Sequence, residues 1–152
     1  MDVYIDAVYF FEGASIMFNL AKFSVGLSAV IFAGLIPVME INSSHLFNPQ
    51  WPEHARLHEA WQLLTNTGIS LLALACVWTQ RAPRLGVSLA LIICGAFLTA
   101  WILGATYGGS MLHTDGTQMA VAGLNVAVIV VLIVTGLLTF SWLSLGRARQ
   151  AP

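Results

Sequence analysis

Four long apolar runs dominate this sequence, at about residues 14–39, 54–79, 85–107 and 118–143. A helix needs roughly 20 apolar residues to cross the hydrocarbon core of a bilayer, and each run is long enough. Only 9% of the 152 residues are charged, far below the ~25% of a soluble domain. We therefore expect an all-α fold, an integral membrane four-helix transmembrane bundle, with residues 1–152 forming a single domain.

The rest of the composition excludes several classes of protein. Six basic residues against seven acidic ones give no basic face for nucleic acid. Cys76 and Cys94 fall inside apolar runs, which predicts small buried side chains rather than a disulfide framework. The chain begins with the acidic stretch Met1–Asp6, whereas a cleavable signal peptide begins with a positive segment. We expect the first apolar run to be a helix of the mature protein.

Arginines predict the orientation in the membrane. Cytoplasmic loops carry an excess of Lys and Arg, and four arginines lie between the second and third runs or after the fourth: Arg81, Arg84, Arg147 and Arg149. We therefore expect both termini in the cytoplasm. The first and third loops would then lie on the outer or lumenal side, which Arg56 alone marks with a positive charge.

Polar residues inside the apolar runs are expected to face the bundle interior, because lipid offers them no hydrogen-bond partner. The first run carries such residues at a spacing of three and four, which places them on one helical face: Glu12, Ser15, Asn19, Lys22 and Gly26. Counting about 1.5 Å per residue predicts one central layer that contains Lys22, Asn66, Thr99 and Asn125. Two other interpretations stay open, a layer that only fixes helix packing and a Lys22 side chain that reaches to the inner interface.

All four histidines fall on the expected outer side: His45, His54, His58 and His113. His54 and His58 are four residues apart, so a helix would place them on one face, where they could share a proton or a metal ion. In the acid–base interpretation these two residues are catalytic. Glu53 or Glu59 orients an imidazole, and Arg56 holds a carbonyl or carboxylate of the substrate. A third interpretation is a structured loop whose histidines cap helices.

The metal interpretation assigns a zinc or iron ion to the histidines and one acidic neighbour: His45, His54, His58, His113 and Asp115. Two histidines alone are too few, since such sites use three or four protein ligands. Position 55 is alanine, whereas a zincin protease carries Glu directly after the first histidine, so that class is excluded. Either no cofactor or one metal ion fits the sequence.

The segment from Asn42 to His58, NSSHLFNPQWPEHARLH, resembles a signature of small four-helix membrane proteins, mostly fungal and bacterial, grouped as a domain of unknown function. Their pattern is Asn-x-Thr-His-x-Phe-Asn-Pro-x-Trp-x-x-His-Ala-Arg-x-His, and this chain departs from it at Ser44. The family often carries a glutamine soon afterwards, and here Gln62 follows Trp61. The resemblance implies a four-helix membrane fold and transfers no activity. The architecture is also distantly similar to that of emopamil-binding and sterol-isomerase proteins, which are small helical bundles that act on lipophilic molecules.

Together these features predict a pocket that opens toward the outer leaflet, with the histidine loop above it and the polar layer below. Phe18 and Phe97 are expected in its walls. We expect it to bind a lipophilic small molecule through several polar or aromatic residues: Lys22, Asn19, Gln62, Asn66, Asn125, Trp51 and Trp101.

The first functional hypothesis is an enzyme of the isomerase, cyclase or hydrolase type that uses histidine acid–base chemistry on such a molecule. One alternative is a metal-dependent membrane oxidoreductase. The other is a non-catalytic protein that binds a lipophilic ligand or takes part in assembly. Membrane lipid is an expected partner, and a homodimer stays open.

Overall fold

A computed structural model describes the backbone of residues 2–112 and 116–147, and their side chains apart from those of residues 2–12 and 14. Four helices in this part of the chain are long and apolar enough to cross a membrane: Ser15–Glu40, Glu53–Trp78, Pro83–Tyr107 and Val126–Arg147. The prediction of an all-helical protein with four such helices is confirmed, and one short β-hairpin is added to it.

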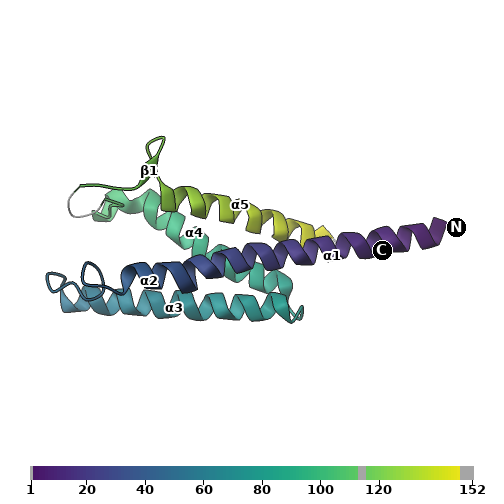
Figure 1. Cartoon of the computed structure of the whole chain (residues 1–152), viewed down its shortest axis with the longest axis horizontal. Coiled ribbons are helices and arrows are strands. Elements are labelled where there is room, and N and C mark those ends of the chain that lie inside the picture. The colour runs from purple at the N-terminus through teal and green to yellow at the C-terminus, as the bar shows by residue number, and fades with distance from the viewer. Residues whose placement is uncertain (1, 113–115, 148–152) are drawn as a thin grey trace.

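The first of these helices belongs to a longer continuous rod (Figure 1). α1 covers Asp2–Ala29, the π-helical segment η1 covers Val30–Leu35, and α2 covers Ile36–Glu40. The π-helix precedes Pro37, which lacks the N–H for a normal helical hydrogen bond and crowds the preceding turn. The predicted span of about residues 14–39 agrees with the apolar stretch Ser15–Glu40. The helix itself extends further toward the N-terminus, to Asp2, and no proline interrupts residues 2–36.

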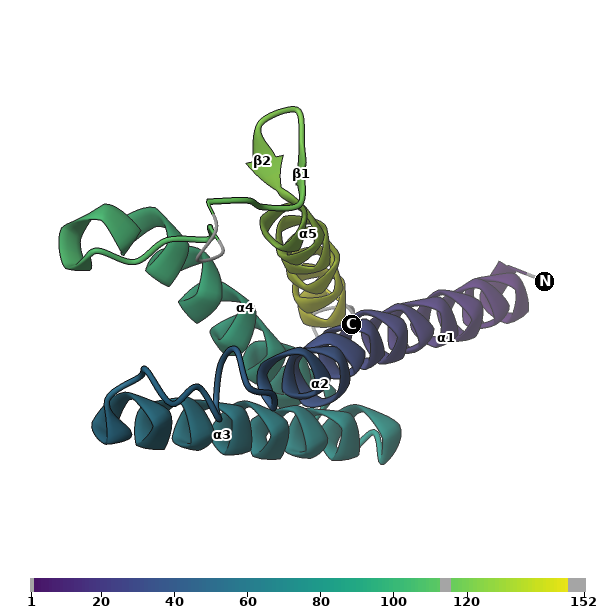
Figure 2. The same cartoon turned by 60° about the vertical axis from the view of Figure 1, so that its left-hand side comes forward.

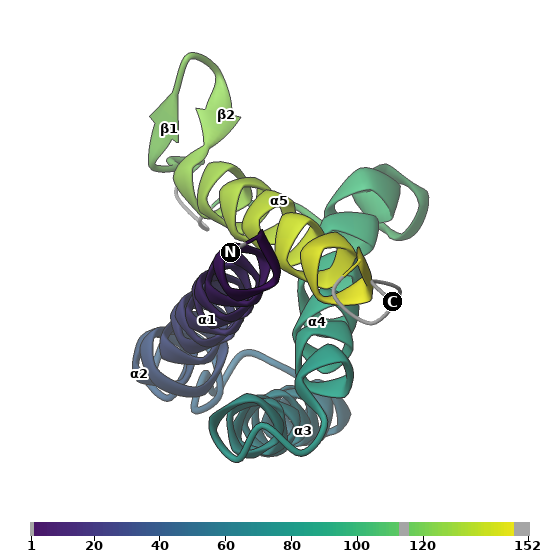
Figure 3. The ribbon, with the colours of Figure 1, turned by 90° about the vertical axis from the view of Figure 1, so that its right-hand side faces the viewer.

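α1 and α4 (Pro83–Tyr107) form the middle of the bundle, with α3 (Glu53–Trp78) on one side and α5 (Val126–Arg147) on the other (Figure 1 and Figure 3). Their shared core is apolar, and Val25, Val87 and Leu138 are completely buried in it. Val77 of α3 is buried in the same core, so all four long helices contribute to it.

The two ends of the bundle differ in their polar residues. The turn at residues 79–82 and the end of α5 lie at one end, and the loop at residues 41–52 lies at the other (Figure 1). We call the first the arginine end, for Arg81, Arg84 and Arg147. We call the second the histidine end, for His45, His54 and His58.

The bundle opens toward the histidine end. There the C-terminal half of α4 and the hairpin diverge from α2 and α3 (Figure 2). The side chains along this half of α4 are mostly exposed, and Ile102 is 70% exposed. The helices therefore enclose no continuous interior at this end.

The fourth helix starts later than we predicted. The expected start was residue 118, but α5 starts at Val126, after an antiparallel hairpin of β1 (Ala120–Val121) and β2 (Leu124–Asn125). The turn residues Ala122 and Gly123 have φ angles of 50° and 82°, and a tight hairpin turn needs such positive values. Gln118 and Asn125 therefore precede the helix. The apolar residues around the turn resemble the start of a helix in sequence, which explains the error.

Candidate functional site

Two asparagines fold the loop at the histidine end. The side-chain oxygen of Asn42 accepts hydrogen bonds from the backbone N–H groups of Ser44 (2.8 Å) and His45 (3.1 Å). It also accepts one from the Ser44 hydroxyl (2.7 Å). Asn48 accepts a hydrogen bond from the N–H of Gln50 (2.9 Å) and donates one to the carbonyl of Ser44 (3.1 Å). Short polar side chains set turns in this way, so both asparagines of the signature have a structural role.

His45 lies in a polar cluster beside this loop. Its Nε2 is 3.6 Å from Glu40 Oε2 at the end of α2. Its ring meets Trp51 edge to face, with the ring centroids 6.0 Å apart. Glu59 of α3 is half-buried and interacts electrostatically with both Glu40 and His45. His45 thus connects the loop to the helices on either side of it.

His54 and His58 form a separate pair on the first turns of α3. Their Nε2 atoms are 3.0 Å apart, within hydrogen-bond distance, and the ring planes are nearly perpendicular, at 82°. The indole of Trp61 lies beside His58, with the ring centroids 5.8 Å apart. All three side chains are exposed. The spacing of four residues therefore brings the two imidazoles together, as the sequence predicted.

Arg56 lies on the other face of the same helix. Residues two apart in an α-helix are separated by about 200° around its axis, and the Arg56 side chain is half-buried while His54 and His58 are exposed. Its Nε is buried and has no hydrogen-bond partner among the described residues. Glu53 is exposed at the start of the helix. The five residues predicted to be catalytic are therefore distributed around α3 instead of converging on one point.

The predicted polar layer is not formed. Lys22 lies near Trp78, the last residue of α3, so it is at the arginine end. Asn66 is twelve residues earlier in α3, about 18 Å away along the helix axis. Asn125 lies at the far end, where its side chain accepts a hydrogen bond from the N–H of Ala127 (2.9 Å) and donates one to Gln118 (3.4 Å). Counting residues failed because contacts between helices, and not the ends of the apolar runs, set their relative heights.

The other residues predicted to bind substrate are dispersed. Asn19 and Gln62 are exposed, and Trp101 is exposed on the diverging half of α4. Phe97 packs on the core, edge to face with Phe32, with the ring centroids 6.4 Å apart. Phe18 also packs against the core. These residues do not surround a common pocket.

The predicted metal ligands do not come together in the described part of the chain. Residues 2–112 and 116–147 contain no cluster of three or more His, Cys, Asp or Glu side chains that could hold an ion. His45 and the pair of His54 and His58 occupy different clusters. His113 and Asp115, the other two predicted ligands, lie outside the described residues.

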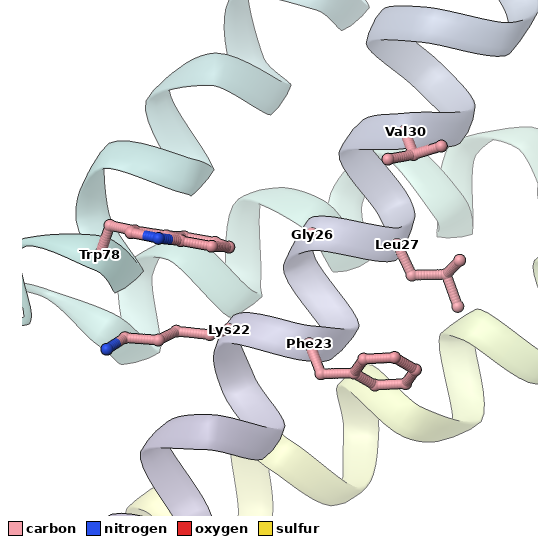
Figure 4. A pocket seen from close by; sticks show the side chains of 6 residues that line it. All are labelled: Lys22, Phe23, Gly26, Leu27, Val30 and Trp78. Atoms are coloured by element: carbon pink, nitrogen blue, oxygen red, sulfur yellow. The ribbon is translucent and has the colours of Figure 1, made fainter.

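Two shallow grooves lie elsewhere on the described surface, between the α1–η1 rod and α3. Their volumes are 410 and 370 Å³, and no histidine lines either of them. They share Gly26, Val30 and Trp78, so they form one continuous groove. Figure 4 shows the residues that line its part near Lys22. Neither groove is the pocket expected beneath the histidine loop, where the helices diverge.

Sequence reasoning missed the polar contacts inside the bundle. Ser24 of α1 and Ser141 of α5 are fully buried with their hydroxyl oxygens 3.0 Å apart. Ser28 lies 3.7 Å from the sulfur of Cys94. The spacing of four between Ser24 and Ser28 was a visible signal for one polar face. Their partners are far away in sequence, so the contacts themselves could not be predicted.

Comparison with family models, curated proteins and solved structures found no match to this chain.

Proposed function

We propose that this is an integral membrane protein whose four helices cross the bilayer with the arginine end in the cytoplasm. Helices of 22 to 26 residues are about 33–39 Å long, enough for a hydrocarbon core of ~30 Å. Their outward side chains are large and apolar, as at Leu64, Ile102 and Ile133. A soluble monomer rarely exposes apolar surface on this scale, which supports insertion.

Extraction and labelling test this arrangement. The protein should stay with membranes during alkaline extraction. In a background without Cys76 and Cys94, an impermeant maleimide applied to intact cells should label Ser43→Cys but not Arg81→Cys. Release of the protein by alkali would contradict insertion, and labelling of Arg81→Cys alone would contradict the orientation.

We further propose that the His54–His58 pair transfers protons on a lipophilic molecule. The observation that carries this proposal is the 3.0 Å contact between the two Nε2 atoms. In a hydrogen bond at this position one nitrogen donates and the other accepts, so one proton is held between two bases. Histidine can give and take a proton near neutral pH, which is the requirement for general acid–base catalysis.

The surroundings of the pair favour a lipophilic substrate. Leu57, Trp61 and Leu64 lie on the same side of α3 and are 64%, 63% and 74% exposed. In a membrane these side chains would contact lipid, and the pair would lie close to the interface. A molecule that moves within the bilayer would meet the imidazoles there. The reactions that suit this chemistry are isomerisation, cyclisation and hydrolysis.

A solvent-isotope experiment tests the proposal without knowledge of the substrate. Reconstituted protein is incubated in D₂O with a lipid extract of the expressing cells, and the lipids are analysed by mass spectrometry. We expect at least one species to gain deuterium or to be converted. His54→Gln and His58→Gln should abolish this change, whereas His45→Gln, in the other histidine cluster, should retain it. An identical lipid profile for the wild type and both variants of the pair would contradict catalysis.

A second candidate is a protein that binds a lipophilic ligand without converting it. The observation that favours it is the shallow groove between the α1–η1 rod and α3, which no histidine lines. This candidate predicts ligand capture without product, unchanged in His54→Gln.

On the segment Asn42–His58 we also propose kinship with the small four-helix family whose signature it resembles. Its support is the residue pattern, in which Asn42 and Asn48 fold the loop. The likeness to emopamil-binding proteins is one of architecture alone and supports no activity.

A further inference from the structure

We propose that the groove between the α1–η1 rod and α3 binds one anionic phospholipid of the cytoplasmic leaflet. Its headgroup would contact Lys22, and one acyl chain would lie along the groove. This inference rests on the membrane orientation proposed above, but not on catalysis by the histidine pair.

The groove has the shape and chemistry for an acyl chain. Its floor consists of residues with small or no side chains, Gly26, Ala33 and Gly34. One wall is formed by Leu71 and Leu74 of α3. The indole of Trp78 closes over Gly26, such that a Cβ at position 26 would lie 3.4 Å from the ring. The lining is therefore almost entirely apolar and concave.

Lys22 provides the one charge on the groove lining. Its side chain extends along the Trp78 side of the groove (Figure 4). No described carboxylate lies within ion-pair distance of its ammonium group. An anionic headgroup would thus meet a cation that no described carboxylate pairs. Arg81 is exposed at the same end but does not line the groove.

The groove has the length of one leaflet. Along the rod the groove extends from Lys22 to Gly34, and twelve residues of helix span about 18 Å. Half of a hydrocarbon core of ~30 Å is about 15 Å. Trp78 ends its helix at the level where interfacial tryptophans lie. A lipid with its headgroup at Lys22 would therefore have its chain inside the groove.

A second copy of the chain fits the groove less well. Homodimers usually have two-fold symmetry, which brings the same surface of both chains together. In a membrane, the two-fold axis would place one Lys22 close to the other. Such like-charge contacts oppose association, whereas an anionic lipid is attracted by the same lysine.

Native mass spectrometry of the detergent-solubilised full chain tests the proposal, with phosphatidylglycerol and phosphatidylcholine as probes. We expect the wild type to retain phosphatidylglycerol about fivefold more tightly, the factor that one lysine contributes at a membrane surface. Lys22→Gln should bring the ratio close to one. Arg81→Gln, which removes a cation outside the groove lining, should largely retain the preference.

Two glycine variants test the acyl-chain part. A side chain at Gly34 meets no atom within 4 Å, so Gly34→Leu should fill the groove without disturbing the fold and should weaken binding of both lipids. Gly136→Leu is the matched control, because position 136 on α5 is equally open. An unchanged ratio in Lys22→Gln, or unchanged binding in Gly34→Leu, would overturn the proposal.

The outcome separates this inference from the proposed function. Native mass spectrometry could instead detect a dimer of the wild type and only a monomer of Gly34→Leu. This result would show that a second copy occupies the groove, and it would overturn lipid binding. Resistance to alkaline extraction without any lipid preference would reject the lipid site while insertion stands. Release by alkali would reject insertion itself.

Discussion

Gly86 of α4 lies so close to Ala73 of α3 that a Cβ atom at position 86 would stand 2.7 Å from the Ala73 carbonyl oxygen. The same Cβ would lie 2.8 Å from a methyl carbon of Val77. A backbone oxygen cannot move aside as a flexible side chain can. This contact fixes the distance between the two helices at the arginine end.

Gly86→Val should therefore destabilise the protein. Forcing extra atoms into a packed contact costs about 1–3 kcal/mol, and we expect a lower midpoint of thermal unfolding in detergent. Gly95→Val is the control on the same helix, since position 95 has no neighbouring atom within 4 Å. Equal midpoints for the two variants would show that the close approach is not present in solution.

The buried hydroxyls of Ser24 and Ser141 should be energetically coupled. Their oxygens are 3.0 Å apart with no access to solvent, and hydrogen bonds between membrane helices average about 0.6 kcal/mol. A double-mutant cycle with Ser24→Ala and Ser141→Ala should give a coupling of that size in the free energy of unfolding. Because a hydroxyl has a single hydrogen, one serine donates across this contact, and the other is free to donate to a carbonyl of its own helix. The single variants therefore disturb intrahelical contacts as well and do not by themselves measure the coupling. Strictly additive effects would contradict the contact.

The histidine pair should show a fixed tautomer pattern. When each ring carries a single proton, one ring must hold it on Nε2 and the other on Nδ1 to form the 3.0 Å contact. Nitrogen-15 NMR of the imidazoles should resolve these two forms. In His54→Gln the His58 ring should lose its fixed form, while His45 keeps its own signals. Averaged tautomers for both rings of the wild type would contradict the hydrogen bond.

Asn42→Ala should loosen the loop at the histidine end. It removes the acceptor for the N–H groups of Ser44 and His45, and a hydrogen bond contributes about 1 kcal/mol. We expect roughly fivefold faster hydrogen exchange at these two amides, measured by mass spectrometry. Ser43→Ala changes an exposed side chain in the same loop and serves as the control. Unchanged exchange in Asn42→Ala would mean that other contacts hold the loop.

The four long helices could be predicted from the sequence because their determinants are local. An apolar run longer than a bilayer span is visible without any tertiary information. The pair of His54 and His58 was predictable for the same reason, since helical spacing alone brings residues four apart together. The structure adds the distance between the rings and the position of Trp61 beside them.

The predictions that failed depended on contacts between distant segments or on a backbone angle that the sequence does not indicate. Predicting the polar layer required knowledge of how far each helix is shifted along the bundle axis. The contact of Trp78 with Gly26 fixes α1 and α3 at a different relative shift from the one we assumed. The hairpin before α5 required a positive φ angle at Ala122, where the sequence shows neither glycine nor asparagine as a signal. The expected pocket required α4 to follow α3 to the histidine end, and the two diverge (Figure 2).

The continuous helical rod from Asp2 to Glu40 contributes residues to the groove and to the cluster at the histidine end. Its middle supplies Lys22 and Gly34 to the groove, and its last residue, Glu40, meets His45. A tilt of the whole rod that widened the groove would therefore also displace the carboxylate beside His45. The groove near the arginine end and the loop at the histidine end are thus connected by one continuous helix.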